Sequence, residues 1–220
     1  MGKVVLEKGY LLHIQPMVTT RYNEEEYRQL IDACNKELPE ASAFYIVDSF
    51  GQMDASNMTK RLMITDALLS DSMKLGLHVH NNRQMAYANA VVFLNAPVQH
   101  DLIIDASIMG MGKGAGNVCT ELIAATLQQA GKLYDTADLY TSIHSYFSQQ
   151  RQKTPWGYSL EYYLSSVYGC TPSYIKIFEK DTRVTPTALV TLLANMPVEK
   201  RAMCDREFAK KYLEEFLESN

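Results

Sequence analysis

Gly76-Leu77-His78-Val79-His80-Asn81-Asn82 is the stretch of sequence that most constrains the fold. It begins as an apolar run of the kind found in buried strands and ends in polar residues typical of the following loop. Side chains two apart on a strand face the same way, so His78 and His80 can present two imidazoles to one divalent metal ion. The alternative is that one or both histidines hydrogen-bond within the core. The two asparagines favour the metal site because they offer amide oxygens and supporting hydrogen bonds.

The same pattern of a short apolar run followed by a helical stretch recurs on both sides of this segment. The expected strands are Tyr10–Gln15, Phe44–Val47, Leu75–Val79 and Leu102–Ala106. The expected helices are Glu24–Leu38, Thr59–Leu69, Gln84–Leu94, Val118–Ala130 and, closing the region, Leu139–Gln149. This alternation predicts an α/β fold in which four β/α units share a parallel sheet.

The texture changes near Gln150, after which helix follows helix. Thr185-Pro186 offers an N-cap and a first-turn proline for a helix over Thr187–Asn195, and Arg206–Leu217 has one apolar face. We therefore expect a β/α region over residues 1–150 and a small helical tail over residues 151–220.

Composition excludes several classes of function. The 220 residues are 47% hydrophobic and carry a net charge of −4, which gives no basic footprint for nucleic acid. No apolar stretch approaches the roughly 20 residues of a membrane span, and the N-terminus does not resemble a signal peptide. Four cysteines without CxxC spacing suit reduced thiols. We expect a cytoplasmic protein that binds neither nucleic acid nor membrane.

Polar residues also end the first and second expected strands, where β/α folds place ligands. Asp48 and Ser49 could orient a ligand or a metal-bound water, although the same residues are ordinary turn formers. Gln15 is a possible lining residue of the same pocket.

A glycine-rich loop runs from Asp105 to Asn117 and leads into a helix whose N-terminus favours an anion. The rival interpretation is a dinucleotide-binding loop. That reading expects the glycine turn in the first β/α unit and an acid at the end of the next strand. Here the loop follows the last strand, and Asp135 and Asp138 lie in helical or loop sequence, so the dinucleotide reading is disfavoured.

Taken in order, the motifs QPM from Gln15, DSFGxM from Asp48, GLHVHNN from Gly76 and DxSxxGxGxGAGN from Asp105 resemble the last four β/α units of the DRE-TIM metallolyases, the HMGL-like family. The resemblance covers about residues 8–130. It implies the C-terminal half of a TIM (β/α)8 barrel followed by a helical tail. It also implies a divalent ion, Mn²⁺ or Mg²⁺, held in part by His78 and His80.

The glycine loop is most similar to that of the 4-hydroxy-2-oxovalerate aldolase branch, since it has neither the cysteine of the CoA lyases nor the Glu-Arg pair of the synthases. This resemblance implies a carbon–carbon lyase for a small 4-hydroxy-2-oxo acid or similar oxo acid. Asn117 and Gln15 would then contact substrate, Asp48 and Ser49 would line the pocket or its surroundings, and Tyr158 would correspond to an active-site tyrosine of the region after the barrel.

The family's arginine-aspartate element, which supplies a further metal ligand and steadies the enolate, belongs to the first barrel strand and is not found here. Asp205-Arg206-Glu207 repeats its letters inside an amphipathic helix, where its charges should face solvent. We expect a fragment from a truncated gene first, and otherwise a half that pairs with a separate N-terminal half or forms a homo-oligomer. The isolated chain should be inactive as an aldolase, and the alternative function is a catalytically silent binding or assembly module.

Overall fold

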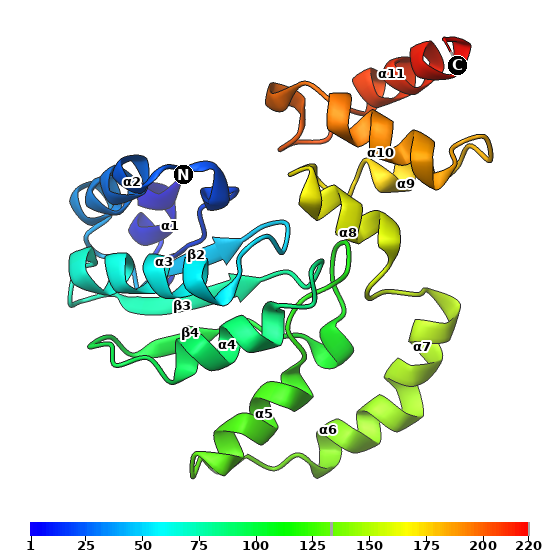
Figure 1. The fold of residues 1–220 in the computed structure, drawn as a ribbon. Helices are drawn as coiled ribbons and strands as arrows, with labels where there is room; N and C mark the ends of the chain where they lie inside the picture. The colour runs from blue at the N-terminus through cyan, green and yellow to red at the C-terminus, as the bar shows by residue number, and fades with distance from the viewer. Residues whose placement is uncertain (133, 220) are drawn as a thin grey trace.

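A parallel sheet of four strands forms the centre of the β/α region in the computed structural model, which describes residues 1–132 and 134–219. The strands are β1 (His13–Ile14), β2 (Ala43–Asp48), β3 (Lys74–Val79) and β4 (Leu102–Ile104). They pair in sequence order, each parallel to the next. This is the sheet of half a TIM barrel, as the sequence predicted, with helices between successive strands (Figure 1).

One face of the sheet packs against the helices. These are α2 (Glu24–Glu37), α3 (Ala55–Leu68), α4 (Ala86–Leu94) and α5 (Thr120–Gln129), while α1 (Gly2–Glu7) precedes β1 and has no buried residue. Alternate residues of the central strands, including Phe44, Ile46, Leu75 and Leu77, are fully buried and form one cluster with apolar residues of the helices. The main core therefore lies outside the curve of the half barrel, where β/α crossovers place it.

The opposite face of the sheet carries a second, smaller apolar cluster of Ala43, Tyr45 and Val47, with Ile103 packed against it. Tyr45 pairs with Gly76 in the register of β2 and β3, and a Cβ at Gly76 would lie 2.5 Å from three atoms of the Tyr45 ring. The aromatic ring thus lies directly over the glycine. This face also bears the candidate site.

Several boundaries differ from the sequence expectation for local reasons. The helix α3 begins at Ala55 because the Asp54 side chain accepts a hydrogen bond from the Asn57 N–H and caps it. The first strand was expected over Tyr10–Gln15, but β1 contains only His13 and Ile14. Among the described strands, it pairs with β2 alone. Where one amphipathic helix was expected over Leu139–Gln149, α6 (Ala137–Ser142) and α7 (Ser148–Lys153) flank a π-helical turn at Ile143–Phe147.

The tail has its own core, built from α8 (Leu160–Val167), α9 (Ile175–Phe178), α10 (Pro186–Asn195) and α11 (Arg206–Glu218). Thr185 caps α10 as predicted, by accepting from the Ala188 N–H. Figure 1 shows α6 and α7 as an arm that leads from α5 to this tail. Within the described part of the chain, no helix combines the length and apolar character that crossing a membrane requires.

The tail docks on the loops that follow β2 and β3. The Gln52 side chain donates to the Ser166 carbonyl at 3.0 Å, and the Ser166 hydroxyl donates to the Gly51 carbonyl at 3.1 Å. The buried Asn82 donates its amide to the Tyr162 carbonyl at 3.0 Å. These bonds fix α8 beside the carboxyl ends of the strands, which are the ends that carry the candidate site.

Candidate metal centre and active site

The imidazoles of His78 and His80 come together on the inner face of the sheet. His78 is on β3, and His80 lies just beyond it in an isolated bridge with Asn117. Their ring centroids are 5.3 Å apart and their planes are inclined at 81°. The two-residue period of the strand therefore has the effect that the sequence suggested.

Each imidazole has its Nδ1 engaged by an oxygen of the protein. His78 Nδ1 lies 3.1 Å from Asp105 Oδ2, and His80 Nδ1 lies 3.2 Å from the Lys113 carbonyl oxygen. A carbonyl or an ionised carboxylate can only accept, so both Nδ1 atoms carry the proton, and Nε2 is the nitrogen through which each ring could bind a metal. Burial, together with the nearby His78, lowers the pKa of His80 to about 4. His80 is thus a neutral imidazole near pH 7.

Asp105 is a central residue of this site to which the sequence analysis gave no role. The same Oδ2 that faces His78 also accepts a hydrogen bond from Gln15 Nε2 at 3.0 Å. The carboxylate therefore joins the ends of β1, β3 and β4. Burial, and after it the charge of Asp105, raises the pKa of Tyr45 to about 12. The signal that could have found Asp105 is the alternation of β4, which puts it on the same face as Ile103 and the histidines.

Asp48 and Ser49 hold the loop that follows β2. The Asp48 carboxylate is 1% exposed and accepts from the backbone N–H groups of Gln52 and Met53, both at 2.8 Å. Burial raises its pKa, and these N–H donors work in the opposite direction. The Ser49 hydroxyl oxygen accepts from the Val18 N–H at 2.8 Å. The Asp48 carbonyl accepts from the His80 N–H at 3.2 Å, which ties the loop to the histidine pair.

The glycine loop folds back to place Asn117 beside His80. The Asn117 N–H donates to the Gly110 carbonyl at 2.9 Å, and a Cβ at Gly116, where φ is +84°, would collide with that oxygen. The Asn117 amide nitrogen donates to the Met111 carbonyl at 3.2 Å. Its Oδ1 is buried and has no hydrogen-bond partner among the residues described. A polar atom left this way is an acceptor available to a ligand.

Asn81 and Asn82 do not face the histidine pair as supporting ligands. Asn81 Oδ1 accepts from the Ala86 N–H at the start of α4, and Asn82 is committed to the tail. The Asn81 amide oxygen therefore serves the start of α4, and the Asn82 amide nitrogen serves the docking of the tail.

Tyr158 lies in the segment between the arm and the tail. Trp156, two residues earlier, donates its indole N–H to the Met109 carbonyl at 2.9 Å and so attaches this segment to the loop that follows β4. Tyr158 itself is 55% exposed.

The described residues fit part of a metal site. They offer two adjacent imidazoles, and each histidine has the oxygen partner on Nδ1 that metal-bound histidines usually have. In residues 1–132 and 134–219, no group of three or more His, Cys, Asp or Glu side chains is arranged to hold a metal ion. Two imidazoles would fill only part of a coordination sphere, since Mn²⁺ and Mg²⁺ prefer six ligands.

The sequence of the chain is similar to those of known aldolases. The chain is 31% identical to a 4-hydroxy-2-oxovalerate aldolase of Thermus thermophilus over 160 residues, which are 68% of this chain and 43% of that protein. It is 38% identical to one of Chloroflexus aurantiacus over 91 residues, covering 41% and 25% of the two chains. The chain thus spans less than half the length of these curated relatives.

Solved structures agree on the fold. The N-terminal domain of a putative aldolase from Bacteroides vulgatus matches with a TM-score of 0.68 and 25% identity, over 82% of this chain and 58% of that one. The carboxyl transferase domain of Rhizobium etli pyruvate carboxylase matches in fold, with a TM-score of 0.67 at 13% identity, over 99% and 39%. The HMGL-like family model matches residues 3–147. The chain belongs to the HMGL-like family.

Proposed function

We propose that this chain carries the metal-binding face of a divalent-metal-dependent carbon–carbon lyase that acts on a 4-hydroxy-2-oxo acid or a similar oxo acid. The observation that carries the proposal is the pair of adjacent imidazoles at the end of β3, each with its Nδ1 engaged by an oxygen of the protein. The curated relatives, which are named 4-hydroxy-2-oxovalerate aldolases, support this substrate class.

His78 and His80 would be the protein ligands of the ion, with Mn²⁺ or Mg²⁺ as the metal. Bound there, the ion would act as a Lewis acid toward a 2-oxo acid group. Asp105 keeps the His78 ring oriented, with its Nδ1 protonated and its Nε2 directed away from the carboxylate. The Lys113 carbonyl does the same for His80.

The other residues would bind and position the substrate. Gln15 shares Asp105 with His78 and would contact the oxo acid through its amide, and Asn117 would do so through its unpartnered Oδ1. Asp48 and Ser49 would act by holding the β2 loop beside His80. The exposed phenol of Tyr158 would exchange a proton with the substrate's 4-hydroxyl group, which must lose its proton when the bond to C3 breaks.

We propose further that the isolated chain has negligible aldolase activity. The described residues provide no third His, Cys, Asp or Glu side chain arranged to complete a metal site with the histidine pair, and electrostatic stabilisation is usually the largest catalytic contribution. The two outer strands β1 and β4 each pair on one side only, so a complementary half or a second copy would cover them. The same observation favours the second candidate, a catalytically silent binding or assembly module.

Pyruvate release from 4-hydroxy-2-oxopentanoate, coupled to lactate dehydrogenase with Mn²⁺ present, tests these functions. We expect turnover only when a separately expressed N-terminal half of a related aldolase is added, and its loss in His80→Ala. Light scattering on the same samples reports whether the two halves, or two copies of the chain, associate. Turnover that survives both His80→Ala and a chelator would refute the metal-dependent lyase. Association without turnover would favour the silent module.

A further inference from the structure

A groove of about 550 Å³ lies between the β/α region and the tail, and neither His78 nor His80 lines it. Four arginines line it: Arg21 from the 3-10 turn before α2, Arg61 from α3, Arg83 from the loop after β3, and Arg201 from the tail. The described lining includes no aspartate or glutamate. Four formal positive charges thus converge in a chain whose net charge is −4.

Neutral oxygens hold these guanidinium groups in place. Arg21 donates to the carbonyls of Gly169 and Val198, at 2.9 and 3.2 Å. Arg83 donates to the hydroxyl and the carbonyl of Ser166, at 3.0 and 3.3 Å. The remaining bonds are from Arg83 to the carbonyl of Gln52, from Arg61 to those of Thr19 and Tyr22, and from Arg201 to those of Ala194, Met196 and Tyr168. Such acceptors orient a guanidinium without neutralising its charge.

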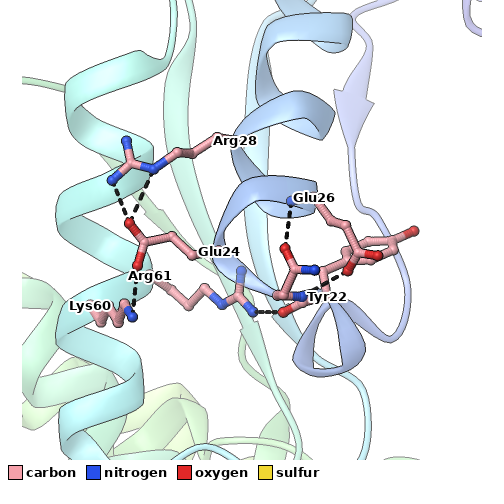
Figure 2. A network of polar contacts seen from close by, with 7 residues as sticks. Tyr22, Glu24, Glu26, Arg28, Lys60 and Arg61 are labelled. Atoms are coloured by element: carbon pink, nitrogen blue, oxygen red, sulfur yellow. Dashed lines mark hydrogen bonds and ion pairs between the residues drawn. The ribbon is translucent and has the colours of Figure 1, made fainter.

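Two acids whose charges reach groove arginines, Glu24 for Arg61 and Asp48 for Arg83, have their own hydrogen-bond partners elsewhere. Figure 2 shows Glu24 turned toward Arg28 and Lys60, both at 2.7 Å, while Arg61 beside it points to the Tyr22 carbonyl. Asp48, whose charge reaches Arg83, is buried and occupied by backbone N–H groups. Among the described residues, none of the four groove arginines forms an ion pair.

Such a lining has the chemistry of an anion site. Guanidinium groups bind phosphate oxygens in pairs through their fixed fork of N–H donors. The volume lies in the range of small-molecule sites, roughly 300–1,000 Å³. Val167 and Val198, which are 41% and 65% exposed, offer the groove an apolar side.

We propose that this groove binds a phosphorylated small molecule, with its phosphoryl groups among the arginines and its apolar part against the two valines. The site joins the β/α region to the tail, since Arg21 and Arg83 already bond to tail residues. A bound phosphoryl group would therefore also hold the two regions together.

Calorimetric titration with pyrophosphate tests the proposal on the purified chain at low ionic strength, where charge interactions are least screened. Arg21→Gln removes one guanidinium of the groove, and Arg183→Gln is the matched control, because Arg183 is an exposed tail arginine paired with Asp181. We expect wild type and the control to bind alike, and Arg21→Gln to bind about 10-fold or more weakly, as for loss of a charged hydrogen bond. Equal binding by Arg21→Gln, or no binding by wild type, would overturn the site.

Two further measurements keep the proposal testable if Arg21→Gln does not fold. In the wild type, pyrophosphate should protect Arg21 and Arg83, but not Arg183, from modification by phenylglyoxal, as read by mass spectrometry. If pyrophosphate protects none of the three arginines, or all three equally, the site is overturned. Arginines that only link the tail to the sheet would not be protected selectively by the anion. Titration with malonate tests whether the groove binds carboxylates as well as phosphoryl groups. If malonate binds as tightly as pyrophosphate, the assignment to phosphoryl groups is wrong.

Discussion

Gly76→Ala is the substitution whose effect the structure specifies most sharply. The new Cβ would lie 2.5 Å from three atoms of the Tyr45 ring, whereas carbon atoms pack at about 3.5–4.0 Å. Tyr45 is 1% exposed and its hydroxyl lies 3.3 Å from His13 Nδ1, so the ring has little room to move. The ring or the strand must shift by roughly 1 Å for the methyl group to fit.

The size of the effect follows from two opposing contributions. Overpacking a filled site costs about 1–3 kcal/mol. Replacing glycine by alanine restricts the unfolded chain, which stabilises the folded state by about 0.4–1 kcal/mol where the methyl group fits. The steric term is larger, so we expect Gly76→Ala to lower the free energy of unfolding by about 1–2 kcal/mol in urea titrations.

The Tyr45→Leu background supplies the control, because a smaller side chain leaves room beside Gly76. There the same glycine substitution should be neutral or slightly stabilising, and the double-mutant cycle should show a coupling between the two positions. A Gly76→Ala chain as stable as wild type, or a cost unchanged by Tyr45→Leu, would refute the packing described for the inner face of the sheet.

Two carboxylates give the remaining predictions. Asp105→Asn removes the charge that orients His78, so Mn²⁺ affinity measured by calorimetry should fall about 10–100-fold, while Asp101→Asn, an exposed residue just before β4, should leave it unchanged. Asp66 is nearly buried, which alone would raise its pKa, but hydrogen bonds from His100 and backbone N–H groups outweigh burial and lower it. A carboxyl whose pKa falls on folding stabilises the fold above its unfolded pKa of about 4, and this contribution is lost as pH falls through the folded value. The difference in unfolding free energy between wild type and Asp66→Asn should therefore be larger near pH 7 than below about pH 4, where it shrinks as the folded carboxylate takes up its proton, and a difference independent of pH would contradict the assignment.

The sheet could be predicted from the sequence because its strands are local signals. The runs around Ile46, Leu77 and Ile103 are apolar and lie at β/α spacing, and each forms a strand. The run from Tyr10 lost most of its expected length, since a strand paired on one side has fewer hydrogen bonds to extend it. The π-helical turn after Ser142 could not be predicted, because the helical spacing of apolar residues continues through it without a break.

The site was predictable only where periodicity determines direction. The alternation of β3 brought His78 and His80 together, and the same rule applied to β4 would have found Asp105. The directions of the other site side chains depend on tertiary contacts. The amide of Asn82 is drawn to α8, which lies some 80 residues further along the chain, and no local pattern reports that contact.

Manganese binding by the purified chain at pH 7, followed by pulsed electron paramagnetic resonance, tests most directly whether the histidine pair is a metal centre. The account predicts one Mn²⁺ per chain with hyperfine coupling to two imidazole nitrogens. It also predicts loss of that coupling in His78→Ala and in His80→Ala, and its retention in His144→Ala, where the exposed histidine lies on the π-helical turn. The same stoichiometry and the same two-nitrogen coupling in His80→Ala would contradict it.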